Sequence, residues 1–194
     1  MDIDNKTTYQ NLREEIMYYT KKQDTCITTA FSLTVSIWSL ALTVSKPWLA
    51  LIPLAIVIPM SMIVCNCRHS IAFLASYMAI FLEKGIDNGW ETLREKYYIK
   101  QPNKFSSSLL LFSSKFGFGI LSFVSIIIFS FLCIESETIN CCSWWFVMVL
   151  IAFTIIAIAQ EIICIRFSDV SVMKNKMMQT WEDVYIEYKS DHKE

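Results

Sequence analysis

Residues 25–45 constrain this chain more than any other stretch, because 21 consecutive positions carry no charged side chain. An α-helix rises about 1.5 Å per residue, so this stretch would extend roughly 30 Å, the thickness of the hydrocarbon core of a bilayer. A charge-free helix of that length is typical of a membrane-spanning segment. The sequence therefore predicts that the chain crosses a membrane here.

The same stretch carries a stripe of hydroxyl side chains spaced alternately four and three residues apart. The stripe consists of Thr25, Thr29, Ser32, Ser36, Ser39 and Thr43. At about 100° per residue, all of them fall on one face of a helix. Such small residues let helices approach closely, which is the interpretation we favour, whereas hydroxyl rings from several copies would line an aqueous path. Hydroxyls also bond to carbonyls of their own helix, so the stripe by itself demands no external partner.

Three further segments, residues 48–65, 116–134 and 144–165, are apolar enough to span a bilayer in a chain that is 54% hydrophobic. We therefore expect an all-α, polytopic membrane protein with four transmembrane helices and cytosolic helical extensions. The expected segments are an amphipathic helix at 1–24, a transmembrane hairpin at 25–65, a cytosolic helical segment at 66–115, a second hairpin at 116–165 and a C-terminal amphipathic helix at 166–194. The first helix should continue into the first span, since residues 18–26 contain neither Gly nor Pro.

The distribution of Lys and Arg predicts the orientation of these spans. Of 17 basic residues, only Lys46 lies in the short loop after the first span, and none lies between residues 134 and 143. Basic residues concentrate on the cytoplasmic side of membrane proteins. Both termini and the middle segment should therefore be cytosolic, with Trp48, Trp144 and Trp145 at the outer interface.

Two cytosolic stretches present apolar side chains that predict an assembly surface. The run 71–82 is apolar on nearly every helical face but is too short to span a membrane, so we expect it to pack inside a protein assembly. A second stripe recurs along residues 173–188 among charged residues. The predicted assembly surface comprises Ile71, Leu74, Met78, Phe81, Met173, Met177, Trp181 and Val184.

Cysteine positions suggest one further feature, while other chemistry is sparse. Cys133, Cys141 and Cys142 flank the outer loop and are the candidates for a disulfide, because disulfides persist in oxidising compartments. We expect no metal site, since Cys65 and Cys67 point to different sides of a helix. The sequence contains no recognisable arrangement for catalysis or cofactor binding and no basic cluster suited to nucleic acid.

The spans contain almost no ionisable residues, which disfavours proton-coupled transporters and voltage sensors. The strongly polar pair within them is Gln160 and Glu161, near the inner end of the fourth span. At that depth, the Glu161 side chain could reach the cytoplasmic interface.

Several short motifs resemble small bacterial membrane proteins that accompany antiviral systems. The motif Leu12-Arg13-Glu14-Glu15-Ile16 is followed by Gln23-Asp24 and then by the Thr- and Ser-rich first span. The second span, which contains Trp and Pro, is followed by Tyr77 and by Phe81-Leu82-Glu83. In size and span number the chain is similar to four-span accessory proteins of CRISPR loci that encode an RNA-guided RNase. The resemblance implies a non-enzymatic membrane partner in defence.

Together, these features predict a homo-oligomeric protein of the bacterial inner membrane that acts as a pore or perturbs the bilayer. The alternative is a non-conducting adaptor that binds a cytosolic protein through its helices. Either function would use the lipid bilayer and other protein chains as partners, without a cofactor.

Overall fold

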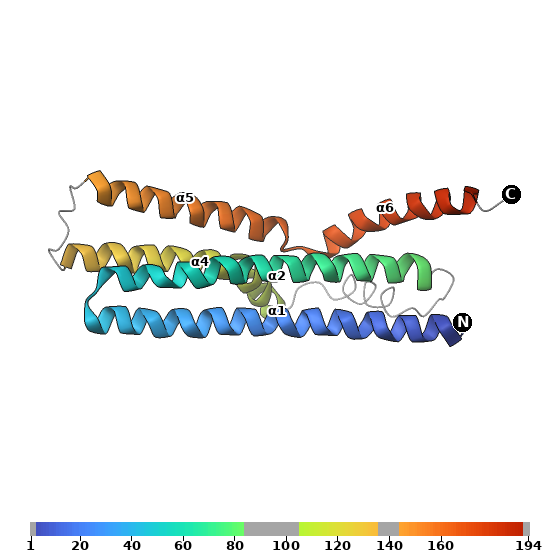
Figure 1. Ribbon diagram of the computed structural model, residues 1–194, viewed down its shortest axis with the longest axis horizontal. Coiled ribbons are helices and arrows are strands. Elements are labelled where there is room, and N and C mark those ends of the chain that lie inside the picture. The colour runs from blue at the N-terminus through green and yellow to red at the C-terminus, as the bar shows by residue number, and fades with distance from the viewer. Residues whose placement is uncertain (1–2, 84–104, 136–143, 192–194) are drawn as a thin grey trace. The chain divides into compact units, whose positions relative to one another are not determined.

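The computed structural model describes residues 3–83, 105–135 and 144–191 of the chain (Figure 1). Every regular element in these ranges is helical. The elements are α1 (Ile3–Val44), the 3₁₀ turn η1 (Pro47–Leu51), α2 (Ile52–Tyr77), the π-helical turn η2 (Met78–Leu82), α4 (Phe105–Glu135), α5 (Trp144–Arg166) and α6 (Val170–Asp191).

Four helical segments are long and apolar enough to cross a membrane, which confirms the predicted all-α class and the number of candidate spans. These segments are Lys6–Val44, Pro47–Leu82, Phe116–Ile134 and Val147–Arg166. Residues 84–104 of the expected cytosolic helical segment and residues 136–143 of the outer loop lie outside the described residues.

The helix α1 runs unbroken through 42 residues, so the predicted continuity of the N-terminal helix with the first span is confirmed. It ends at Ser45, whose φ of 53° lies in the left-handed region that stops a helix. Pro47 then begins η1. Proline has no backbone N–H, but at the first position of a helix this group would have no partner within the helix, so no hydrogen bond is lost. This short turn joins α1 to α2, as the Ser45-Lys46-Pro47 sequence predicts.

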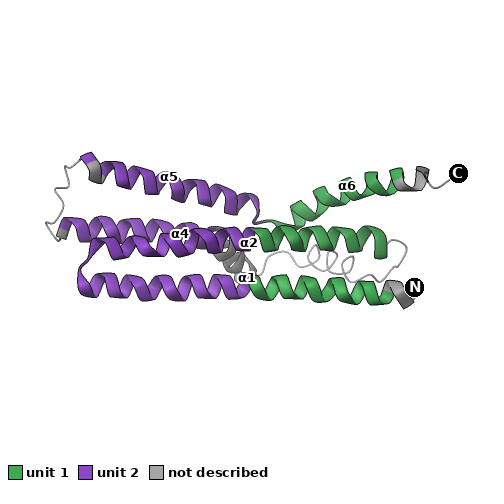
Figure 2. Ribbon diagram, viewed as in Figure 1, with its two compact units in different colours: residues 1–22, 66–109, 169–194 green, residues 23–65, 110–168 purple. Residues whose placement is uncertain are grey.

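Two compact units make up the fold (Figure 2). Unit 1 comprises residues 1–22, 66–109 and 169–194, and unit 2 comprises residues 23–65 and 110–168. Both α1 and α2 therefore contribute residues to each unit.

The core of unit 2 consists of α1, α2, α4 and α5 side chains in three clusters. Ala30, Val57 and Phe118 belong to the first cluster, and Ala41 and Phe129 to the second. The third cluster joins residues of α2, α4 and α5. Alanines at the α1 positions allow that helix to approach its neighbours closely.

Unit 1 has its own core, which α1, α2 and η2 form together with Val170 at the start of α6. Ile16, Ile71 and Met78 are buried there. The Tyr9 hydroxyl donates a hydrogen bond of 3.1 Å to Glu83 Oε1, which joins the beginning of α1 to the end of η2.

The helix α6 begins at a capped N-terminus. The Asp169 carboxylate accepts hydrogen bonds from the backbone N–H groups of Ser171 and Val172, at 3.1 and 3.2 Å. Aspartate is among the preferred residues at this position, because its oxygens satisfy N–H groups that have no partner within the helix. This cap separates α6 from the apolar α5.

Candidate functional site

The hydroxyl stripe of α1 lies on the surface of the single chain. Five of its members are exposed and Thr29 is half-buried; the exposed residues are Thr25, Ser32, Ser36, Ser39 and Thr43. Ala30, Thr34 and Ala41, which are fully buried, project from roughly the opposite side of α1 at about 100° per residue. Most of the stripe therefore lies outside the buried core of unit 2, and we call the stripe the hydroxyl face.

Three hydroxyls of this face donate hydrogen bonds within α1. Ser36 Oγ donates to Ser32 O at 2.8 Å, Ser39 Oγ to Val35 O at 3.0 Å, and Thr43 Oγ1 to Ser39 O at 2.8 Å. Each of these hydroxyl groups thus has its proton satisfied locally while its oxygen can still accept. The hydroxyl face can meet water or another helix without leaving these donors unpaired.

The exposed side chains of α5 differ in kind from those of the hydroxyl face. They include Ile151, Ile155, Ile158 and Ile162. Large aliphatic side chains are what a helix presents to lipid, because hydrocarbon offers nothing for a polar group to bond. Two surfaces of unit 2 are therefore chemically distinct, one aliphatic and one hydroxyl-lined.

Polar contacts also occur inside unit 2, between α1, α4 and α5. Trp38 Nε1 donates a hydrogen bond of 2.9 Å to Ser125 Oγ, which in turn donates to Leu121 O. Ser122 Oγ donates to Gln160 Oε1 at 3.0 Å. These bonds join α1 to α4 and α4 to α5, within segments that are otherwise apolar.

Glu161 lies beside this contact, and its burial against α4 is the feature that the sequence interpretation missed. Both of its carboxylate oxygens are buried, and neither makes a hydrogen bond of good geometry with the described residues, although the backbone N–H of Gly119 lies beside them. The carboxylate lies against Gly119 of α4, so closely that a Cβ atom there would overlap it. The sequence showed the polar pair at 160–161 and the small residues of α4, but it did not show that they face each other.

The predicted assembly surface lies largely within unit 1 of a single chain. Ile71 and Met78 are buried in its core, and Leu74 packs against that core. On another side of α2, the Trp181 ring lies 5.3 Å from that of Phe73, 5.5 Å from Tyr77 and 5.6 Å from Phe81.

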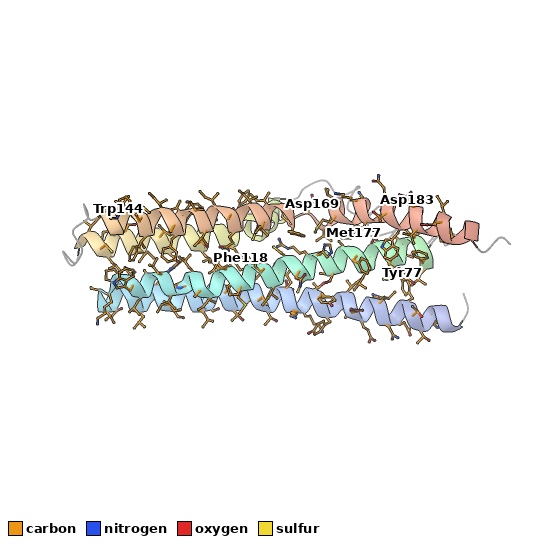
Figure 3. All side chains as sticks on the ribbon, turned by 45° about the horizontal axis from the view of Figure 1, so that its top comes forward. Tyr77, Phe118, Trp144, Asp169, Met177 and Asp183 are labelled. Atoms are coloured by element: carbon orange, nitrogen blue, oxygen red, sulfur yellow. The ribbon has the colours of Figure 1, made fainter. Side chains whose placement is uncertain are left out.

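Figure 3 labels Tyr77 and Met177, which belong to the two helices that this aromatic contact joins. Met173 and Met177 are half-buried, while Val184 is exposed. The structure thus gives most of these apolar side chains partners in their own chain.

Of the candidates for a disulfide, Cys133 is buried in a cluster of unit 2 with Phe129 and Leu132. Cys141 and Cys142 lie outside the described residues. Trp48 and Trp144 are exposed, and the Trp48 ring lies 5.3 Å from that of Phe129.

No protein family, curated protein or solved structure matches the chain.

Proposed function

We propose that this protein is a homo-oligomeric integral membrane protein in which the hydroxyl faces of several copies line a path across the bilayer. It would act as a pore or by perturbing the membrane. The observation that carries the proposal is the position of the hydroxyl face on the outside of unit 2, away from the buried Ala30, Thr34 and Ala41.

The chemistry of the two exposed surfaces supports this proposal. The aliphatic residues of α5 suit lipid, whereas a continuous hydroxyl surface suits water or the close approach of another helix. Exposed apolar residues flank the hydroxyl face on both sides, with Leu33 and Leu40 on one side and Val35 and Leu42 on the other. Those flanks could contact neighbouring copies while the hydroxyl groups between them meet water.

Replacement of Ser32, Ser36 and Ser39 by Leu tests the proposed lining. We expect the triple variant to insert into liposomes normally but to lose the dye and ion leakage of the wild-type protein, because leucine removes the polar surface. A matched control replaces Ile151, Ile155 and Ile158, which are exposed apolar residues of α5, by Leu. Wild-type leakage in the Ser variant would exclude the hydroxyl face as the lining.

We further propose that both termini are cytosolic and that the membrane is the bacterial inner membrane. The concentration of Lys and Arg in three of the regions outside the spans supports this orientation. Reporter fusions test it: a periplasmic phosphatase reporter should be active after Lys46 and inactive at either terminus. Activity at the C-terminus would contradict the orientation. The resemblance to accessory proteins of CRISPR loci suggests antiviral defence as the setting.

A non-conducting adaptor is the second candidate, and the separate core of unit 1 favours it. Residues of α1, α2, η2 and α6 build that core outside the most apolar helices, so the spans could serve to anchor a folded module. The exposed acidic residues Glu182 and Asp183 on α6 would then be available to a cytosolic partner. Wild-type protein that leaks no dye and crosslinks through α6 to one heterologous protein would support the adaptor.

A further inference from the structure

Gln160 and Glu161 bring an amide and a carboxylate into the contact between α4 and α5. Gln160 is 4% exposed and accepts the Ser122 hydrogen bond through Oε1, while its Nε2 has no partner among the described residues. The two Glu161 oxygens are likewise buried, with the backbone N–H of Gly119 beside them. Three polar atoms of one short segment within the apolar span Val147–Arg166 thus have no hydrogen bond of good geometry to the described residues.

Gly119 explains how the carboxylate fits against α4. A Cβ atom at this position would overlap the Glu161 carboxyl group, so only glycine leaves the space that the carboxylate fills. Gly119 and Ser122 are three residues apart and share one face of α4. The carboxylate of Glu161 and the amide of Gln160 thus lie against neighbouring positions on the same face.

A bare carboxylate in this setting is energetically unfavourable. Removing an ion from water costs several kcal/mol in a protein interior unless an opposite charge compensates it. Ionisable residues inside membrane segments are rare for that reason, and they commonly mark ion or proton pathways.

The titratable groups that the described residues bring to this part of unit 2 include cysteine thiols, which carry no positive charge. Cys164 follows Glu161 by three residues on α5 and contacts Cys65 of α2, and Cys26 of α1 packs against the same cluster. Lys115 lies four residues before Gly119 on α4 and is therefore placed on the same helical face.

We propose that Glu161, with Gln160 and Ser122, forms an intramembrane binding site for a small cation, either a proton or Na⁺. A proton would convert the carboxylate into a neutral carboxylic acid by forming one O–H bond, with no other bond broken. Sodium would instead be held by carboxylate, amide and hydroxyl oxygens, which are the oxygen donors that such hard cations prefer. The site is separate from the hydroxyl face of α1, and it does not depend on that face lining a path.

Labelling of the full-length protein in lipid nanodiscs with dicyclohexylcarbodiimide tests the site. This hydrophobic reagent adds to protonated carboxyl groups inside membranes, and mass spectrometry of peptides locates the adduct. We expect Glu161 to be labelled several-fold more than Glu182, an exposed carboxylate of α6 that serves as an internal control. Labelling should decrease as the pH is raised, because deprotonation removes the reactive form.

A second labelling experiment, at constant pH, identifies which cation neutralises the carboxylate. Suppression of Glu161 labelling by NaCl but not by choline chloride would identify Na⁺, whereas insensitivity to both salts would identify the proton. Gly119→Ala should reduce the labelling because its Cβ displaces the carboxylate, while Ile120→Ala, on the exposed side of α4, should not.

Two results would overturn the proposal. One is a wild-type protein in which Glu161 is labelled no more than Glu182 at any pH or salt concentration. The other is labelling that appears only in Lys115→Gln, because a lysine rather than an exchangeable cation would then neutralise the carboxylate. Neither result depends on leakage, so failure of this site and failure of the proposed pore can be distinguished.

Discussion

At the scale of single residues, the Trp38 indole links α1 to α4 through one hydrogen bond. Trp38 lies on another side of α1 than the hydroxyl face, where the sequence alone would allow it to meet lipid or apolar neighbours. The structure instead pairs its Nε1 with Ser125 Oγ at 2.9 Å. A hydrophobicity pattern identifies which side of a helix is apolar, but it does not reveal which donor on that side finds an acceptor on another helix.

This bond predicts a measurable coupling between Trp38 and Ser125. In a double-mutant cycle with Trp38→Phe and Ser125→Ala, we expect a coupling free energy of about 0.6 kcal/mol, the average for hydrogen bonds between membrane helices, and no more than about 1.7 kcal/mol. Unfolding in mixed micelles with increasing dodecyl sulfate measures it. Ser130→Ala is the matched control, because Ser130 Oγ donates to Ile126 O of its own helix. Equal coupling in both cycles would contradict the assignment.

At the scale of the elements, the contact of α6 with α2 and η2 is the part of unit 1 that sequence patterns described least well. Both apolar stripes were recognised, but we expected them to form an assembly surface between chains. Trp181 instead packs against Phe73, Tyr77 and Phe81 of the same chain. Periodicity shows that a helix face must be covered, and it does not show whether the cover comes from the same chain.

Truncation of Trp181 tests whether this aromatic contact holds α6 in place. We expect Trp181→Ala to destabilise the docking of α6 by about 2 kcal/mol, because the variant loses the contacts of a large half-buried aromatic side chain. Hydrogen exchange followed by mass spectrometry should show faster exchange in α6, with little change in α4. Ile186→Ala, at a position that is 66% exposed, is the control. Unchanged protection of α6 in the Trp181 variant would show that other contacts hold the helix.

At the scale of the whole molecule, the sequence was sufficient to predict the helical class, the number of candidate spans and the continuity of α1. Long charge-free stretches and the absence of Gly and Pro decide these properties locally. The polar contacts inside unit 2 were harder to predict from the sequence. The polar pair at residues 160–161 is evident in the sequence, but its contact with Gly119 and Ser122 depends on the way α4 packs on α5, which no local pattern encodes.

The outward position of the hydroxyl face is likewise a property of packing rather than of composition. The stripe was evident in the sequence, where packing within the bundle was the favoured interpretation. In the structure, the buried side of α1 is the one with Ala30, Thr34 and Ala41, and the stripe remains available to other molecules. If copies of the chain associate through or around this face, the protein must form a closed ring to enclose a path.

The subunit number of the purified protein in nanodiscs, measured by native mass spectrometry, tests this central claim most directly. We predict a closed assembly of four or more copies, because hydroxyl faces from that many α1 helices can surround an aqueous path. A monomer or a dimer would contradict the claim, since so few helices leave no room for water between them, and it would favour the adaptor function instead.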